Sequence, residues 1–412
     1  MKISGVRRPW RVTAAALIAG TVLLSSGCGS GDKAPSWQGG GSKAEGGGDS
    51  APSETPSPEP TLSTVAVVSP ATDAKNVVAA TEVKYTSDDP ENTTVEVTGP
   101  DGKEVTGTLD KDGKVWRPAK ALAYGTKYTV TVKGTASEGK NGSIASTFTT
   151  MAKPTKLIRV SSFLGDGSKV GVAMPLIIKF NRAIPKDYRD DVERHMTVTA
   201  TPAQEGSWGW ISPTEVHFRP KVYWKAYSKV FYKVQLGGVP LGNGYYGKSD
   251  LTVDLNVGRS FIMTVSNKTK HMTVKQDGKT IKSIPVSLGK ASTPSSSGTM
   301  VVIDKQRHTI FDTTDELGPV KGYRTPIDFA QRITWSGQFI HAAPWSEGKQ
   351  GHTNVSHGCV NVSEAMGAWL FARTMMGDVI TVSGTEEKLK NGNGWTDWNM
   401  SYAAFKKTSA LS

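Results

Sequence analysis

Short alternating segments separated by turn dipeptides, with no long amphipathic helix among them, limit most strongly what this chain can fold into. Lys127–Lys133 alternates polar and apolar residues with period two, as a half-buried strand does. Asp101-Gly102 and Asp112-Gly113 are dipeptides typical of hairpin turns. This pattern predicts a β-sandwich of immunoglobulin size over residues 64–151.

The same theme returns further along the chain. Trp116-Arg117-Pro118 has a counterpart in Phe218-Arg219-Pro220, and tyrosines follow both. Leu176–Phe180 and Leu251–Leu255 have the composition of further strands. We therefore predict a second sandwich in tandem with the first, over residues 152–258.

A third, β-rich domain with one main helix is predicted over residues 259–384. Asp277-Gly278 indicates another hairpin. Ser363 is a suitable N-cap for the helix, and Gly377 is expected to end it. Residues 385–412 hold Trp395 and Trp398 and predict a short helical extension packed on this domain.

The N-terminus reads as an export signal. Basic residues precede the apolar run Val12–Leu24, which is short for a bilayer span. The following segment resembles a bacterial lipoprotein signal over residues 1–28, in which Cys28 becomes the lipidated first residue. Ser25 departs from that pattern, since an aliphatic residue is usual three positions before the cysteine. Ordinary secretory cleavage, with Cys28 free or removed, is the alternative.

Residues 29–63 are rich in Gly, Ser and Pro and predict a disordered tether, because such a composition buries little apolar surface. The whole chain carries a formal net charge of +12. Its Lys and Arg residues are scattered, and no nucleic-acid-binding module is recognisable, so nucleic acid is not an expected partner. General attraction to an anionic cell envelope fits this charge, as does a merely soluble basic surface.

Cys359 is the one cysteine outside the leader, and it follows Ser356-His357-Gly358. A free thiol has a pKa near about 8.5, so a nucleophilic cysteine needs a nearby imidazole to take its proton. His341 lies upstream and can supply one. Gly358 gives the backbone freedom to direct amide N–H groups at a developing oxyanion.

His341, fourteen intervening residues, and then Ser356-His357-Gly358-Cys359-Val360-Asn361 resemble the signature of L,D-transpeptidases of the YkuD type. Together with the leader, the two sandwiches and the Trp-rich tail, the chain resembles actinobacterial lipoprotein members over roughly residues 64–405. The resemblance implies a mainly β fold: two tandem immunoglobulin-like sandwiches, then a YkuD-type catalytic domain with one main helix and a short C-terminal extension.

The resemblance also implies roles for the site residues. Cys359 is the expected nucleophile, and His341 the general base, oriented by a neighbouring backbone carbonyl. Close relatives have a serine after that histidine, whereas this chain has Ala342. The remaining expected roles are oxyanion N–H groups from His357 and Gly358 with the amide of Cys359, loop shape from Ser356 and Asn361, and substrate binding from Tyr323, Trp345 and His352.

The implied reaction is acyl transfer between peptidoglycan stem peptides. The thiolate attacks a stem tetrapeptide, D-alanine leaves, and an amine of a neighbouring stem attacks the thioester to form a 3→3 cross-link. The family implies no cofactor, and carbapenems as covalent inhibitors at Cys359. The expected location is the extracytoplasmic face of the cell membrane, with a lipid anchor at Cys28 and reach into the wall.

Three other interpretations remain open. His341, His352, His357 and Cys359 are four zinc-type ligands, although the His-x-Cys spacing is unusual for zinc. An L,D-carboxypeptidase would form the same acyl-enzyme and use water as acceptor. A non-catalytic wall-binding lipoprotein would bind through its sandwiches and leave the cysteine unused.

Overall fold

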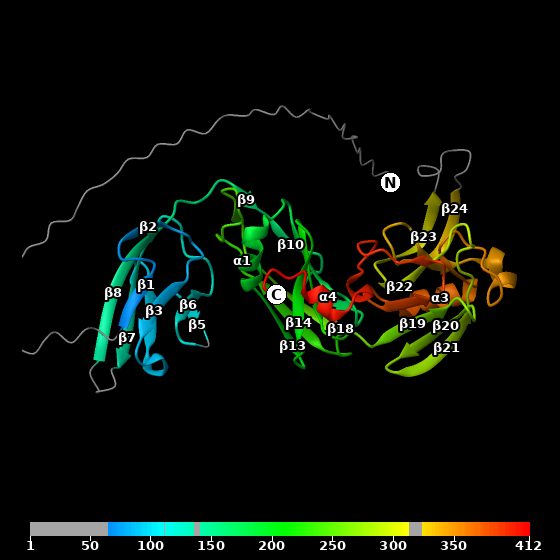
Figure 1. The fold of residues 1–412 in the computed structure, drawn as a ribbon, viewed down its shortest axis with the longest axis horizontal. Coiled ribbons are helices and arrows are strands. Elements are labelled where there is room, and N and C mark those ends of the chain that lie inside the picture. Colours follow the sequence, from blue (N-terminus) through cyan, green and yellow to red (C-terminus); the bar gives the residue numbers. More distant parts are fainter. Residues whose placement is uncertain (1–64, 111, 136–140, 313–323) are drawn as a thin grey trace, which may run out of the picture. The chain divides into compact units, whose positions relative to one another are not determined.

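A computed structural model describes residues 65–412 except 111, 136–140 and 313–323 (Figure 1). Strands dominate these residues, and the predicted mainly β fold is confirmed. The predicted leader, its Cys28, the tether and Tyr323 lie outside the described residues. Within the described part of the chain, no helix has the length and apolar character needed to cross a membrane.

The first sandwich has two four-stranded sheets whose inner faces enclose Trp116, Tyr128 and Phe148. The Asp112-Gly113 hairpin joins two neighbouring strands, and Gly113 takes a φ of +60° there. The strands are β1 Val65–Ser69, β3 Val83–Ser87, β6 Val115–Pro118 and β5 Gly107–Leu109 in one sheet, and β2 Ala74–Val77, β8 Asn141–Thr150, β7 Lys127–Thr135 and β4 Thr94–Thr98 in the other; a 3-10 turn, η1, spans Pro90–Asn92.

The second sandwich repeats this design with a larger aromatic core, which includes Trp208, Trp210 and Trp224. Its strands are β10 Val160–Ser162, β12 Leu176–Phe180, β15 Glu215–Pro220 and β14 Gly206–Ser212 in one sheet, β11 Ser168–Val170, β18 Leu251–Val257, β16 Lys229–Val234 and β13 Met196–Thr201 in the second, and the pair β9 Leu157–Ile158 and β17 Tyr246–Gly247. The 3-10 turn η2 Lys186–Tyr188 and helix α1 Arg189–Arg194 lie between β12 and β13, where no helix had been predicted.

The third domain packs a six-stranded sheet and a four-stranded sheet around one helix. The first sheet is β21 Lys279–Pro285, β20 His271–Gln276, β19 Phe261–Ser266, β27 Val379–Ser383, β22 Ser296–Val301 and β28 Glu387–Lys388. The second is β23 Asp304–Asp312, β24 Arg324–Arg332, β25 Phe339–Ala342 and β26 Val360–Val362. The predicted Asp277-Gly278 hairpin joins β20 to β21, with both residues at positive φ as a type I′ turn requires.

Helix α3, Glu364–Arg373, begins at the predicted N-cap, because the Ser363 side chain accepts a hydrogen bond from the Met366 amide. The predicted end at Gly377 is wrong. Thr374 already has extended backbone angles, and its hydroxyl bonds both the Leu370 carbonyl and the buried Gln331 side chain. α3 packs on β24 and β25 and so supports the strand that carries His341.

The second sandwich and the third domain share apolar core. Val301 and Val379 of the third domain pack in the same buried cluster as the sandwich side chains. The Gly171 amide donates to the Met376 carbonyl at 2.7 Å. Arg259, at the start of the third domain, forms a bidentate ion pair with Asp378, whose side chain is fully buried.

The C-terminal extension packs on the second sandwich as well as on the third domain. The sequence predicted packing on the third domain only. It contains the 3-10 turn η4 Asp397–Asn399 and helix α4 Tyr402–Lys406. The Trp398 indole donates to the Ala173 carbonyl at 2.8 Å, and buried Glu193 of α1 accepts from the Ala410 amide at 2.7 Å. The extension therefore connects the two domains, and we call it the clasp.

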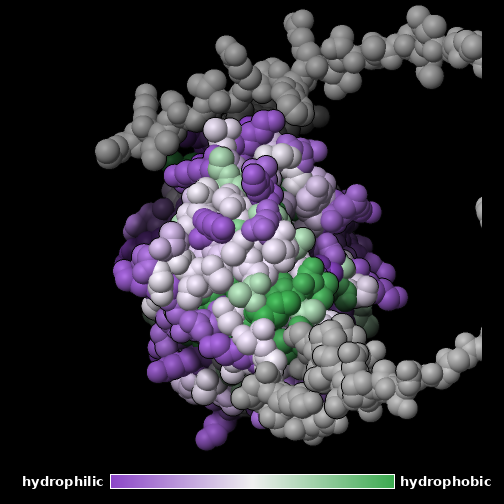
Figure 2. All heavy atoms as spheres, turned by 90° about the vertical axis from the view of Figure 1, so that its left-hand side faces the viewer, coloured by the Kyte–Doolittle hydropathy of each residue, from purple (hydrophilic) through white to green (hydrophobic). Residues whose placement is uncertain are grey.

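Figure 2 shows one face that is mostly hydrophilic, with a single confined hydrophobic patch. Large apolar side chains with high exposure include Trp335 and Trp345, which both lie in the third domain. These two also line the cavity described below.

Candidate active site

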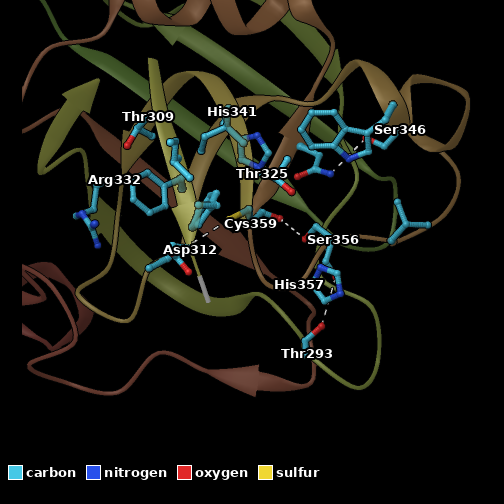
Figure 3. A pocket seen from close by; sticks show the side chains of 18 of the residues that line it. Thr293, Thr309, Asp312, Thr325, Arg332, His341, Ser346, Ser356, His357 and Cys359 are labelled. Atoms are coloured by element: carbon cyan, nitrogen blue, oxygen red, sulfur yellow. Dashed lines mark hydrogen bonds between the residues drawn. The ribbon is translucent and has the colours of Figure 1, made fainter. Parts of the chain in front are cut away.

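A cavity of about 1060 Å³ opens in the third domain where the motif residues meet (Figure 3). Strands β23, β24 and β25 supply one part of its lining, and the loop before β26 supplies another. His341, Cys359 and Asn361 all line it. The structure thus brings together residues from both halves of the sequence motif.

Parallel pairing of β25 with β26 joins these halves. Ile340 lies opposite Val360, and His341 lies opposite Asn361. Parallel neighbours require a crossover connection, and the residues between the two half-motifs supply it as η3, Pro344–Lys349, and the loop that follows. The spacing in the motif is the length of this crossover.

His341 is a buried imidazole with a defined tautomer. Its Nδ1 lies 2.7 Å from the Ala342 carbonyl oxygen, which can only accept, so Nδ1 carries the proton. Burial lowers the pKa of His341 below its ordinary value, while the Ala342 carbonyl and the Asn361 side chain oppose that shift. The ring is therefore neutral at neutral pH, and Nε2 is left as the proton acceptor.

Ala342 in place of the serine of close relatives does not disturb the orientation of the His341 ring. Side chains alternate faces along a strand, so residue 342 points away from the face that carries the imidazole. Ala342 packs against α3, where a Cβ built on Gly367 would lie 2.9 Å from the Ala342 Cβ. The expected orienting carbonyl is present, and a serine hydroxyl at position 342 would face the helix instead of the ring.

Cys359 is a buried thiol that faces the same cavity as His341 (Figure 3). Burial raises the pKa of Cys359 to about 12. Its Sγ lies 3.8 Å from the Gly337 carbonyl, as a weak donor. Cysteine and histidine are thus both neutral at rest, and a thiolate has to form by proton transfer to the imidazole once a reactant occupies the cavity.

The loop before Cys359 is held by serine hydroxyls. Ser356 Oγ donates to the Cys359 carbonyl at 2.7 Å and accepts from the Gly358 amide at 3.1 Å. Gly358 has a φ of +121°, which side chains rarely permit. The Gly358 N–H is thus engaged by Ser356 in this structure, and its expected role as an oxyanion donor stays a prediction.

His357 lies at the cavity wall beside a lysine. Lys290 Nζ is 3.1 Å from His357 Nε2, and an ammonium can only donate, so Nε2 is the acceptor. Burial and then the charge of Lys290 lower the pKa of His357. The His357 ring is therefore uncharged at neutral pH.

The three predicted substrate-binding residues differ in where they lie relative to the cavity. Trp345 lines the cavity with 61% of its surface exposed, and its ring centroid lies 6.1 Å from that of His341. His352 is exposed in the turn after η3 and is not part of the cavity lining, so its role in substrate binding stays a prediction. Tyr323 lies outside the described residues.

Sequence reasoning missed the opposite wall of the cavity. Phe311 lies edge-on to Phe339 and within 5.9 Å of the His341 ring, centroid to centroid. Trp335 and Arg332 complete this wall beside the thiol. These residues belong to β23, β24 and the turn after them, and nothing in their local sequence marks them as functional.

The zinc interpretation finds no supporting cluster. Among the residues that the structure describes, no group of three or more His, Cys, Asp and Glu side chains could hold a metal ion. His341 and His357 also direct ring nitrogens to a carbonyl and a lysine respectively, and His352 lies away from the cavity wall. The four residues thus do not assemble as ligands.

Comparison with known proteins places this geometry in a family. Residues 74–240 match the Bacterial Ig domain, and residues 260–382 match the L,D-transpeptidase catalytic domain. L,D-transpeptidase 2 of Mycobacterium tuberculosis is 35% identical over 344 residues, which cover 82% of this chain and 83% of that protein. L,D-transpeptidase 5 of the same species is 32% identical, over 83% of this chain and 76% of that protein.

A solved structure of an L,D-transpeptidase in complex with imipenem is 30% identical, with a TM-score of 0.47, and covers 54% of this chain and 97% of that chain. The matches to both curated relatives cover more than four fifths of this chain. The chain belongs to the L,D-transpeptidase family.

Proposed function

We propose that this enzyme cross-links peptidoglycan by a cysteine acyl-enzyme mechanism, with Cys359 as nucleophile and His341 as base. The observation that supports this most strongly is a neutral, buried thiol and a neutral imidazole of known tautomer facing one cavity. A neutral pair of this kind can transfer a proton inside the site and needs no metal or organic group to do so.

The first half-reaction is acylation. His341 Nε2 takes the thiol proton while Cys359 Sγ bonds to the carbonyl carbon between residues three and four of a stem tetrapeptide. The carbonyl electrons move to oxygen, and the Cys359 amide is a candidate donor to that oxyanion. When the tetrahedral centre collapses, the C–N bond breaks and His341 returns the proton to the departing D-alanine amine.

The second half-reaction is transfer. A side-chain amine of a neighbouring stem loses a proton to His341 and attacks the thioester, which releases the thiol and forms the 3→3 cross-link. A cavity of about 1060 Å³ has room for a donor peptide and an acceptor group together. Carbapenems would use only the first half, because Cys359 opens the strained β-lactam ring and the freed amine stays tethered to the acyl group.

Donor-peptide turnover by the compact unit, residues 61–412, tests this function. Incubation with a stem tetrapeptide should yield a dimer whose mass equals that of two tetrapeptides less one released D-alanine. A tripeptide as the sole product would identify an L,D-carboxypeptidase. No turnover by the folded protein would favour the wall-binding lipoprotein.

The location is a separate proposal, motivated by the basic, apolar leader and by Cys28. We infer that Cys28 is lipidated and that the tether and sandwiches carry the active site from the membrane into the wall. Cells fed an alkyne fatty acid should label the wild-type chain and not a Cys28→Ala variant. Equal labelling of both chains, or none of either, would contradict the anchor.

A further inference from the structure

Asn361 occupies a position that a loop-shaping role does not explain. It lies directly opposite His341 in the parallel pairing of β25 and β26, so both side chains leave the sheet on the same face. Only 3% of its surface is exposed. Among the residues that the structure describes, its buried Oδ1 has no hydrogen-bond donor, which is costly unless the acceptor is used at some stage of the reaction.

A buried network determines which way the Asn361 amide faces. Ser346 Oγ donates its only proton to the Ala343 carbonyl at 3.0 Å. The same oxygen can therefore only accept from Asn361, which lies 3.3 Å away through Nδ2. Gln350 Nε2 donates both to Ala343 and to Ser346, at 3.2 and 3.3 Å, and holds the hydroxyl in place.

This orientation leaves Oδ1 for the imidazole side of the residue. We propose that Asn361 is a positioning residue whose Oδ1 stabilises the His341 imidazolium during acylation, and that Ser346 holds the amide in the required orientation. The inference rests on the proposed function, since it needs His341 to act as the base. Cys359, His341 and Asn361 then act together, while the Ala342 carbonyl binds Nδ1 of the ring.

The proton balance is simple. The thiol proton moves to His341 Nε2 as sulfur bonds to carbon, and the imidazolium then has two N–H groups. Nδ1–H already donates to Ala342 and Nε2–H stays directed at the reacting atoms, so Oδ1 stabilises the positive ring through its partial negative charge. When the leaving amine takes the proton from Nε2, His341 is neutral again and this electrostatic stabilisation ends.

The electrostatic surroundings agree with this assignment. Asn361 acts to raise the pKa of His341, against the larger effect of burial. Other titratable or charged groups that line the cavity are Cys359, His357, Asp312, Arg332 and Lys349. None of them is a cause of the His341 shift, which comes from burial, the Ala342 carbonyl and Asn361. The side chain at position 361 is thus the one through which the base can be tuned.

The test is the pH dependence of imipenem acylation by residues 61–412, followed by β-lactam absorbance. The acid limb reports the pKa of His341, because the imidazolium cannot accept the thiol proton. Asn361→Asp places a carboxylate beside the ring and should move the midpoint up by about 1–3 pH units. Asn361→Leu should move the midpoint down and lower the plateau rate by roughly 10- to 100-fold. This loss is smaller than the whole contribution of a general base, which is about 10²–10⁴-fold.

Two further variants make the result decisive. Asn181→Asp in the second sandwich adds the same charge and keeps the acceptor that binds the Arg159 amide, so its profile should match wild type. Ser346→Ala frees the Asn361 amide to turn over and should lower the midpoint as Asn361→Leu does. This variant decides the matter if Asn361→Asp does not fold.

Slower acylation with an unmoved midpoint in the folded position-361 and Ser346 variants would overturn the proposal that Asn361 stabilises the imidazolium. Asn361 would then be a purely structural residue. That outcome differs from failure of the proposed function, in which the wild-type protein itself forms no adduct at Cys359. Opposite shifts for the aspartate and leucine variants are the result that a structural role cannot produce.

Discussion

Cys359→Ala should abolish both the imipenem adduct and the cross-linked product. Alanine removes the only thiol among the described residues, and neither Ser356 nor His357 offers a comparable nucleophile, since the Ser356 hydroxyl donates to the Cys359 carbonyl and the His357 Nε2 accepts from Lys290. Loss of a covalent nucleophile costs on the order of 10⁴–10⁶ in rate. Intact mass after incubation with imipenem measures the adduct directly.

Cys359→Ser is the matched control for shape. The hydroxyl keeps the small polar atom near the Gly337 carbonyl but is a far weaker nucleophile, so it should fold like wild type and form adduct only slowly. Equal unfolding midpoints for the three proteins would assign the loss to chemistry. A stoichiometric adduct on Cys359→Ala would refute Cys359 as the acylated residue.

The motif and the β-rich fold could be predicted from the sequence because both are local or periodic signals. Hairpin dipeptides at Asp112-Gly113 and Asp277-Gly278 mark turns through their backbone requirements, and the structure has both. Ser363 caps its helix for the same kind of reason. The domain boundaries drawn from composition remain predictions.

Features that depend on long-range packing could not be predicted. The end of α3 is set by the contact of Thr374 with Gln331, which lies in another strand. The engagement of the Gly358 amide by Ser356, and the orientation of Asn361 by Ser346, are properties of a folded loop and a strand register. A motif gives residue types, and only the fold shows which polar atom is already occupied.

A buried charge cluster between the second sandwich and the C-terminal extension had no signal in the sequence at all. His217 of β15 lies between two carboxylates, with Nδ1 2.8 Å from Asp397 and Nε2 2.8 Å from Glu215. In the fold it joins the sandwich to η4, where Arg219 also lies over the Trp398 ring.

His217→Gln should destabilise the protein strongly at pH 6 and hardly at all at pH 10. Burial alone would lower the pKa of His217, but Asp397 and Glu215 together raise it to about 9. A raised pKa stabilises the folded state fully below the ordinary value of 6.5, and this stabilisation is lost as pH rises through about 9. The difference corresponds to about 3 kcal/mol of unfolding free energy.

Guanidinium unfolding at a series of pH values, followed by tryptophan fluorescence, measures this effect. Wild type should lose stability between pH 6.5 and 9, and His217→Gln should lack that loss. His271→Gln is the control, because the His271 ring bonds the Thr269 carbonyl and no carboxylate. Parallel pH profiles for wild type and His217→Gln would mean that His217 is neutral in the fold, and the clasp would then rest on Trp398, Glu193 and apolar packing alone.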